Sequence, residues 1–138
     1  MILSVPGVTG GERTAALVEL VDVYPTLCEL VGLPCPEHLE GTSLLPVAHA
    51  PQRSWKKGIF SRIEDAETLR TEQFRFTRYA RATTQGDVGH LPNTGACELF
   101  DLQADPRENV NVAKRPEYLE VVREMERQLA AGWKAMLP

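Results

Sequence analysis

The stretch ELFDLQADPRENVNVAKRPEYLEVVREMERQLAAGWKAML, from Glu98 to Leu137, combines the signals of a strand, a tight turn and a helix. Apolar residues alternate with acidic ones at its start, which predicts a short strand over Glu98 to Leu102. Asp105-Pro106 predicts a turn, because proline presets φ and the aspartate side chain can accept hydrogen bonds from the backbone that follows it. From Pro116 to Met136 apolar side chains recur at helical spacing, which predicts a long helix that buries Leu119, Val122, Met125 and Leu129.

Three segments upstream of this stretch have the pattern of β-strands. They are Lys57–Ile63, Glu67–Glu72 and Gln73–Arg81, and in the last of them aromatic residues alternate with polar ones. Thr71-Glu72-Gln73 predicts a hairpin turn. The apolar face of an antiparallel meander must be buried against another element, and the apolar stripe of the C-terminal helix can pack on it. The sequence therefore predicts an α+β fold, with a small antiparallel sheet of three to four strands packed against a long C-terminal helix.

The sequence of residues 1–32 predicts a strand and a helix. Ile2–Val5 is apolar and ends at Pro-Gly, but no neighbouring strand precedes it, so its backbone groups would lack partners. Asp22 before Val-Tyr-Pro predicts a helix N-cap, and Gly32 predicts the stop. A metal ligand or general base at Asp22 is the alternative. The expected buried face of this helix consists of Val23, Leu27, Leu30 and Val31.

Composition limits the classes of function. A net charge of −4 over 138 residues gives no reason to expect nucleic acid as a partner. No apolar run approaches the ~20 residues of a membrane-spanning helix, and residues 1–13 lack the features of a signal peptide, so no membrane partner is predicted. Cys28, Cys35 and Cys97 form neither a disulfide framework nor a recognisable metal motif. The connection Leu33 to Trp55 is rich in proline and glycine, which predicts a surface segment.

Two segments carry a resemblance to a known family. Glu98 to Ala113, ELFDLQADPRENVNVA, is similar to the closing E-L-Y-D-L-x-x-D-P-x-E-x-x-N-L segment of sulfatases, with Asn109 one place early. Leu17 to Pro46, LVELVDVYPTLCELVGLPCPEHLEGTSLLP, resembles the V-D-x-x-P-T-L-x-x-L-A-G-x-x-x-P-x-x-x-x-G-x-S-L-x-P stretch of the same family. Both occur in the expected order, and the likeness is nearest the iduronate-2-sulfatase-like branch.

The resemblance implies a part of a larger enzyme. Residues 1–50 would be the tail end of an alkaline-phosphatase-like α/β catalytic domain, including the unpaired strand, and residues 51–138 the C-terminal subdomain. The family's formylglycine motif C-x-P-x-R has no match, since Cys35 is followed by Pro-Glu-His. The family's metal ligands also have no match, so this chain would hold no cofactor, and calcium is expected in the full-length parent. The missing N-terminal catalytic domain is the expected partner.

Four residues are candidates for substrate binding: His90, Arg78, Arg81 and His38. Arg78 and Arg81 belong to a basic stripe with Arg70 and Arg75. The stripe is either a solvated face paired with Glu64, Asp65, Glu67 and Glu72, or a surface that recognises a sulfated substrate. His90 lies in the long segment 82–97, where an exposed histidine without function is the simpler interpretation.

Two classes of function follow. In one, the chain is the C-terminal fragment of a sulfatase, which contributes packing and substrate-pocket loops to sulfate ester hydrolysis but is not catalytically competent alone. In the other, it is a stand-alone, non-catalytic binding module that reuses the fold. The upstream reading frame distinguishes them, because only the first requires a C-x-P-x-R motif there. In the first case the isolated chain is expected to self-associate through the orphan strand Ile2–Val5.

Overall fold

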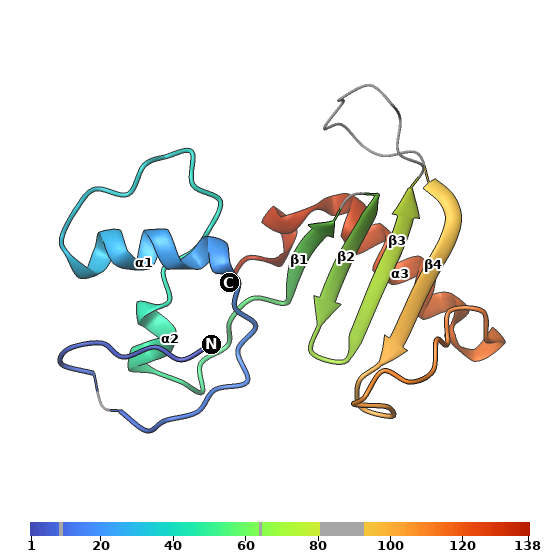
Figure 1. The fold of residues 1–138 in the computed structure, drawn as a ribbon, viewed down its shortest axis with the longest axis horizontal. Coiled ribbons are helices and arrows are strands. Elements are labelled where there is room, and N and C mark those ends of the chain that lie inside the picture. Colours follow the sequence, from blue (N-terminus) through green and yellow to red (C-terminus); the bar gives the residue numbers. More distant parts are fainter. Residues whose placement is uncertain (9, 64, 81–92) are drawn as a thin grey trace. The chain divides into compact units, whose positions relative to one another are not determined.

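The chain folds into two compact units. The computed structural model describes residues 1–8, 10–63, 65–80 and 93–138. One unit comprises Met1–Lys57 with Leu137–Pro138, and the other comprises Gly58–Met136 (Figure 1). Each unit is described by itself below. Among the described residues, no helix is both long enough and apolar enough to cross a membrane.

The second unit is built on a four-stranded antiparallel sheet in the order β1-β2-β3-β4. The strands are β1 (Gly58–Ile63), β2 (Ala66–Thr71), β3 (Phe74–Ala80) and β4 (Asn93–Asp101). Each strand pairs with the next along the chain, as expected of the predicted meander. The predicted number of strands and the turn between β2 and β3 are thus confirmed, while β4 begins earlier than the predicted strand.

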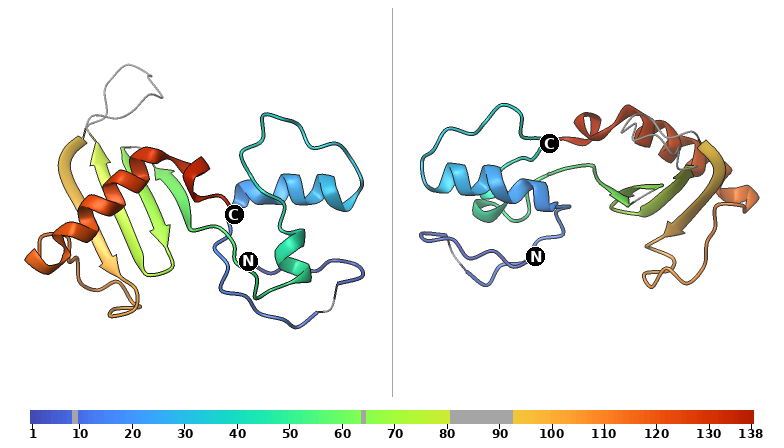
Figure 2. Two further views of the ribbon diagram at one scale, coloured as in Figure 1. Left: turned by 180° about the vertical axis from the view of Figure 1, so that it is seen from behind. Right: turned by 45° about the horizontal axis from the view of Figure 1, so that its top comes forward.

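One face of the sheet is covered by α3 (Leu119–Ala131), which lies across the strands (Figure 2). A 3-10 turn, Pro116–Tyr118, precedes α3, and another, Trp133–Met136, follows it. The predicted C-terminal helix is therefore confirmed, but its α-helical part is shorter at both ends than the predicted range from Pro116 to Met136. The chain leaves the helix at Gly132, whose φ of 78° is a left-handed conformation that a residue with a Cβ adopts at a cost.

The core of this unit lies between α3 and the sheet. Met125 and Leu129 are buried as predicted, and Val122 packs at their edge, but Leu119 at the start of α3 is exposed. The buried apolar residues come from β2, β3, β4, the segment after β4, α3 and the last turn: Leu69, Phe76, Leu99, Val112, Ala113, Met125, Leu129 and Met136.

The outer edge of β4 is closed by the segment that follows the Asp105 turn. The backbone N–H of Leu99 donates to Oδ1 of Asn111 at 3.0 Å, and the N–H of Val112 donates to the carbonyl of Leu99 at 2.9 Å. The side-chain amide of Asn111 in turn donates to the carbonyl of Cys97. A side chain therefore takes the place of a neighbouring strand and satisfies backbone groups that an open edge would leave unpaired.

The first unit contains α1 (Val23–Leu30) and the short α2 (Leu45–His49). Its small apolar cluster consists of Leu44, Val47 and Trp55. The helix α1 ends at Gly32, as the sequence predicts. The N–H of Gly32 donates to the backbone carbonyl of Glu29, and the N–H of Leu33 donates to the backbone carbonyl of Cys28. These are the hydrogen bonds of a Schellman motif.

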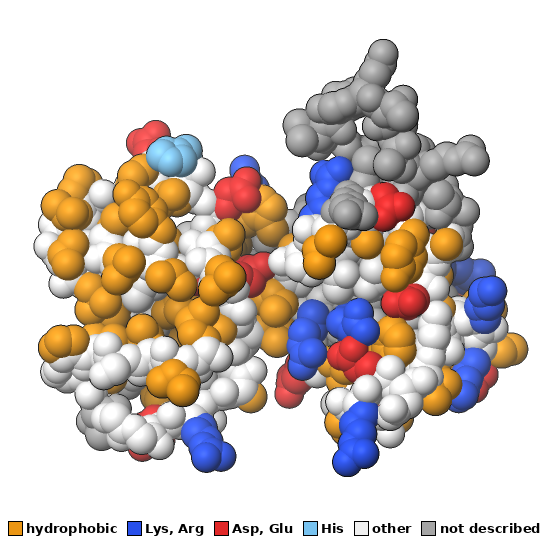
Figure 3. Space-filling view, viewed as in Figure 1, with side chains coloured by type: hydrophobic (Ala, Val, Ile, Leu, Met, Phe, Trp, Pro, Cys, Tyr) orange, Lys and Arg blue, Asp and Glu red, His pale blue; other side chains and the backbone are white. Residues whose placement is uncertain are grey.

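Two predictions for this unit are wrong. Ile2–Val5 forms no strand, and Ile2 is 99% exposed, because no described segment offers it a pairing partner. The face of α1 expected to be buried is exposed instead: Val23, Leu27, Leu30 and Val31. Figure 3 shows apolar side chains gathered on the surface over α1. The opposite face of α1, with Asp22 just before it, Pro25, Thr26 and Cys28, is the buried one.

Candidate functional site

Of the four candidate ligand-binding residues, two fall within the described residues. Arg78 is 7% exposed in β3, and its Nη2 lies 2.5 Å from Oε2 of Glu67 on β2. One of the two interpretations predicted this pairing, but on a solvated face, whereas Arg78 is buried. Its Nε is buried and has no hydrogen-bond partner among the residues that the structure describes. His38 is exposed on the connection between α1 and α2. Arg81 and His90 lie outside the described residues.

Arg70 and Arg75, the other two arginines of the basic stripe within the described residues, lie on the opposite face of the sheet. Arg75 precedes the core residue Phe76, so its side chain points away from α3, and Arg70 is its register partner on β2. Glu108 joins the two guanidinium groups: its carboxylate lies 2.7 Å from Nε of Arg75 and 3.8 Å from Nη1 of Arg70. The guanidinium of Arg75 also lies 4.6 Å from the centre of the Phe100 ring. The stripe predicted from sequence is thus divided between two faces.

Glu108 is a partner that the sequence analysis missed. Its φ of 55° is a left-handed conformation that is uncommon outside glycine. The turn that holds it is made by Asp105, whose carboxylate accepts the N–H groups of Asn109 and Val110. The turn predicted at Asp105-Pro106 therefore has a second effect, since it brings an acidic side chain back over two neighbouring arginines.

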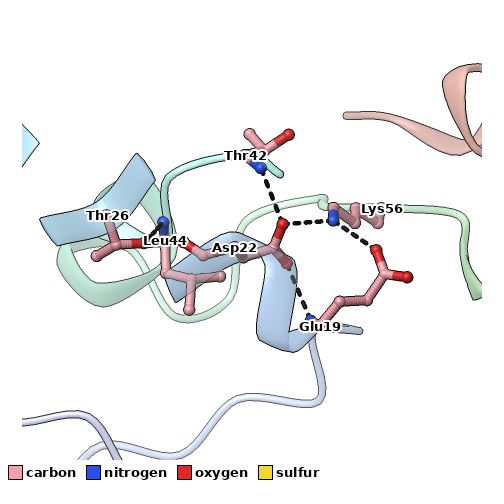
Figure 4. A network of polar contacts seen from close by, with 6 residues as sticks. All are labelled: Glu19, Asp22, Thr26, Thr42, Leu44 and Lys56. Carbon is pink, nitrogen blue, oxygen red and sulfur yellow. Dashed lines mark hydrogen bonds and ion pairs between the residues drawn. The ribbon is translucent and has the colours of Figure 1, made fainter. Parts of the chain in front are cut away.

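A buried polar cluster in the first unit centres on Lys56 (Figure 4). Its Nζ lies 2.6 Å from Oδ1 of Asp22 and 2.7 Å from Oε2 of Glu19. The side chains of Lys56 and Asp22 are 2% and 0% exposed. A buried charge is stable only when it is paired and hydrogen-bonded, and both conditions are met here.

Asp22 also receives two backbone donors and fixes a neighbouring segment. Its carboxylate accepts the N–H of Glu19 at 2.9 Å and the N–H of Thr42 at 2.8 Å. Its own carbonyl accepts the hydroxyl of Thr26 at 2.5 Å, and that hydroxyl accepts the N–H of Leu44 at 2.8 Å (Figure 4). Residues 42–44 are therefore held against the start of α1 by hydrogen bonds.

Gly41 allows the segment before Thr42 to lie against the backbone of Val21. A Cβ at this position would lie 2.0 Å from the carbonyl oxygen of Val21, a distance that no side chain can adopt. The glycine of the segment Gly41-Thr42-Ser43-Leu44 is thus required by a backbone-to-backbone contact, and the threonine that follows supplies the N–H for Asp22.

The geometry decides the role of Asp22. It is the residue at the N-cap of α1, as predicted, but its side chain does not bond to the N–H groups of that helix. Both carboxylate oxygens are occupied by donors from Glu19, Thr42 and Lys56. Because this carboxylate is 0% exposed and both of its oxygens already accept hydrogen bonds, it connects three segments of the unit and presents no oxygen to solvent for a metal or a substrate proton.

A pocket of about 350 Å³ lies beside the turn after β4 and is lined by Asp101, Ala104, Asp105, Asn109, Val110, Val112, Arg115 and Tyr118. Burial alone would raise the pKa of Asp101, but the N–H groups of Ala104 and Gln103 and the hydroxyl of Tyr118 hold the pKa below its usual range. The same hydrogen bond to Asp101 raises the pKa of Tyr118. The carboxylates that line this pocket are therefore engaged in holding the turn.

No metal centre is found in the described part of the chain. Within residues 1–8, 10–63, 65–80 and 93–138, no three histidine, cysteine, aspartate or glutamate side chains are grouped so as to hold an ion. The thiols of Cys28, Cys35 and Cys97 are all free. Burial and the nearby charge of Glu126 raise the pKa of Cys97, which disfavours a nucleophilic thiolate there.

Comparison with known proteins gives one family over almost the whole chain. The model of the family described as N-sulphoglucosamine sulphohydrolase, C-terminal, matches residues 1–134. Among similar proteins, Arylsulfatase K of Gallus gallus is 36% identical over 126 residues, which cover 81% of this chain and 22% of that protein. Arylsulfatase K of Homo sapiens is 33% identical over 131 residues, covering 85% of this chain and 23% of that protein. The chain thus spans less than a quarter of these relatives.

Solved structures show the same fold. The phosphonate monoester hydrolase SpPMH from Silicibacter pomeroyi superposes with a TM-score of 0.73 at 21% identity, covering 96% of this chain and 28% of that one. At this identity the likeness concerns the fold. In that larger chain the fold described here forms little more than a quarter of the polypeptide.

Proposed function

Because the chain belongs to the sulfatase family, as a member of its N-sulphoglucosamine sulphohydrolase C-terminal group, we propose that it serves as the C-terminal part of an enzyme that hydrolyses sulfate esters. The observation that carries this proposal is the match of residues 1–134 to the C-terminal family, together with relatives more than four times as long as the matched segment. The iduronate-2-sulfatase-like branch remains a hypothesis.

We propose that the two parts of the chain belong to two domains of the parent enzyme. Residues 1–50 complete the α/β catalytic domain of the parent enzyme, and residues 51–138 form its C-terminal subdomain. The partner of this chain is accordingly the N-terminal catalytic domain, which supplies the nucleophile and the metal ligands. Calcium, when bound, would polarise the sulfate group there. The acidic residues beside the pocket, Asp101 and Asp105, do not suit it, since their oxygens accept N–H groups of the turn.

Substrate contact by this chain is proposed for the loops rather than for the core of the sheet. His38 is exposed on a connecting segment and free to reach a sulfated ligand. Arg78 is paired with Glu67 and buried, so a role in binding would require that pair to open. Contacts from Arg81 and His90 stay predictions about residues outside the described part of the chain.

The isolated chain is proposed to self-associate. Ile2–Val5 pairs with no strand in the described part of the chain, and Ile2 is 99% exposed, which leaves backbone groups and apolar surface open to a second copy. Sedimentation across micromolar concentrations tests this, and a monomer at every concentration would contradict it.

Activity provides the main test. The purified 138-residue chain should hydrolyse no aryl sulfate above background, with or without added calcium. A chimera in which this chain replaces the matched segment of Gallus gallus Arylsulfatase K should turn over the aryl sulfate. Turnover by the isolated chain, or a folded chimera without activity, would contradict the proposed function.

A further inference from the structure

The pocket beside the turn after β4 is formed by a continuous part of the chain. Its lining begins with Asp101 at the end of β4, continues with five residues of the segment 104–112, and ends with Arg115 and Tyr118 just before α3. Its volume of about 350 Å³ falls within the range of about 300–1,000 Å³ that is typical of small-molecule sites. The pocket is therefore large enough for one small ligand.

Hydrogen bonds within the chain hold the walls of this pocket in place. Oδ2 of Asp101 accepts the hydroxyl of Tyr118 at 3.1 Å, which joins the end of β4 to the start of α3. Oδ2 of Asp105 accepts the N–H groups of Asn109 and Val110 at 2.6 and 2.9 Å, which closes the turn. Because these hydrogen bonds form without a ligand, the site is preorganised, and a ligand would lose little affinity to the ordering of the turn.

Three polar groups of the lining are available to a ligand. The side chain of Arg115 is exposed, and its guanidinium makes no hydrogen bond or ion pair with any residue that the structure describes. The hydroxyl of Tyr118 directs its hydrogen at Asp101, so the phenol oxygen can still accept a hydrogen bond. The side-chain amide of Asn109 donates to Asp105 at 2.9 Å, and its carbonyl oxygen is likewise an acceptor. The pocket thus offers one cation and two neutral acceptors.

The charges of the pocket restrict how an anionic ligand can be oriented. Asp101 and Asp105 are negatively charged and would repel an anion placed beside them. Arg115 carries the positive charge, and a guanidinium binds an oxyanion through two parallel N–H···O hydrogen bonds. An anionic group of the ligand therefore binds at Arg115, while neutral donors bind at Asn109 and Tyr118. A free inorganic anion can make only the first of these contacts.

An acidic sugar carries both kinds of group on a single ring. Its oxyanion matches Arg115, and its hydroxyl groups can donate to Asn109 and Tyr118. Its C–H groups can lie against Val110, which lines the pocket and is 45% exposed. We propose that this pocket binds one sugar unit that carries a sulfo or a carboxylate group. The site is argued from the pocket alone, whereas the sulfo group as its anionic group rests on the proposed function.

Binding to the purified 138-residue chain tests this proposal. Backbone amide signals of the isotopically labelled chain are recorded by NMR during titration with glucose 6-sulfate, glucuronate, glucose and inorganic sulfate. Arg115→Gln removes the cation of the pocket. Arg107→Gln is the matched control, because Arg107 is an exposed arginine of the same segment that does not line the pocket. The signals of the buried residues Met125 and Leu129 report whether each variant is folded.

We expect an acidic sugar to shift the amide signals of Asn109, Val110 and Tyr118 in a saturable way. Arg115→Gln should weaken this binding at least about tenfold, because it removes a charge-assisted hydrogen bond, and Arg107→Gln should leave it unchanged. Glucose should bind the chain and Arg115→Gln equally weakly. The tighter of the two acidic sugars identifies the anionic group that the site takes.

Three results would overturn the proposal. The first is the absence of saturable shifts at Asn109, Val110 and Tyr118 with both acidic sugars, and the second is an equal loss of binding in Arg115→Gln and Arg107→Gln. The third is binding of inorganic sulfate as tightly as glucose 6-sulfate, which would show an anion contact without a sugar site. Sugar binding by this chain beside an inactive chimera would count against the proposed function alone.

Discussion

Replacement of Lys56 by methionine should destabilise the first unit by about 3 kcal/mol. The substitution keeps the length of the side chain but removes the charge that lies 2.6 Å from Asp22 and 2.7 Å from Glu19. Removing one partner of a buried pair costs about 3–5 kcal/mol. The lower end applies, because Asp22 keeps two N–H donors and the side chain of Glu19 is 16% exposed and can be hydrated.

Lys57→Met is the matched control, since Lys57 is the neighbouring residue and is exposed. It should change the free energy of unfolding by less than about 0.5 kcal/mol. The assay is urea unfolding followed by fluorescence of Trp55, which is buried in the same unit, in a Trp133→Phe background. Adding Asp22→Asn to Lys56→Met should recover at most part of the loss, because it removes the negative charge at position 22 but its single amide oxygen can accept only one of the two N–H groups, which bond to different carboxylate oxygens of Asp22. A loss below about 1 kcal/mol for Lys56→Met would refute the argument, since that is the range of a solvated surface pair.

Three further outcomes are expected. Asn111→Ala should cost about 1–3 kcal/mol in urea unfolding of the second unit, because the N–H of Leu99 loses its acceptor, and an unchanged midpoint would show that water replaces it. Met125→Asp should leave no folded second unit by circular dichroism, because it places a charge at a position that is 2% exposed. The folded-state pKa of Asp101 is lowered, so this carboxylate stabilises the fold above its unfolded pKa of about 3.9, and the contribution is lost as pH falls through the folded value. Asp101→Asn should therefore unfold with a weaker pH dependence below about pH 4, and identical acid titrations would contradict this.

The sequence predicts those elements whose signals are local. The two-residue turn after Thr71, the stop at Gly32 and the turn at Asp105 follow from residues that are neighbours in the chain, and all three are present. The α3 stripe follows from helical periodicity, which correctly identifies Met125 and Leu129 as buried.

Other features depend on the surface against which a helix or strand packs. The spacing of apolar residues along the chain does not identify that surface. The spacing of Leu27 and its neighbours identifies the apolar face of α1 but not the surface that covers it, so the burial predicted for that face is wrong in this chain. The partner of Asp22 lies 34 residues away, and no local pattern connects the two. The division of the basic stripe was predictable, because Arg75 and Arg78 are three residues apart and a strand places such residues on opposite faces.

The hydrogen-bonded character of the first unit has a calorimetric consequence. Its buried apolar cluster consists of Leu44, Val47 and Trp55, whereas eight apolar residues form one buried cluster in the described part of the second unit. Heat capacity rises on unfolding because apolar surface is hydrated, and hydration of polar groups lowers it. The first unit should therefore unfold with a small heat-capacity increment per residue and a stability that changes little with temperature. The second unit should show the strongly curved temperature dependence of an apolar core.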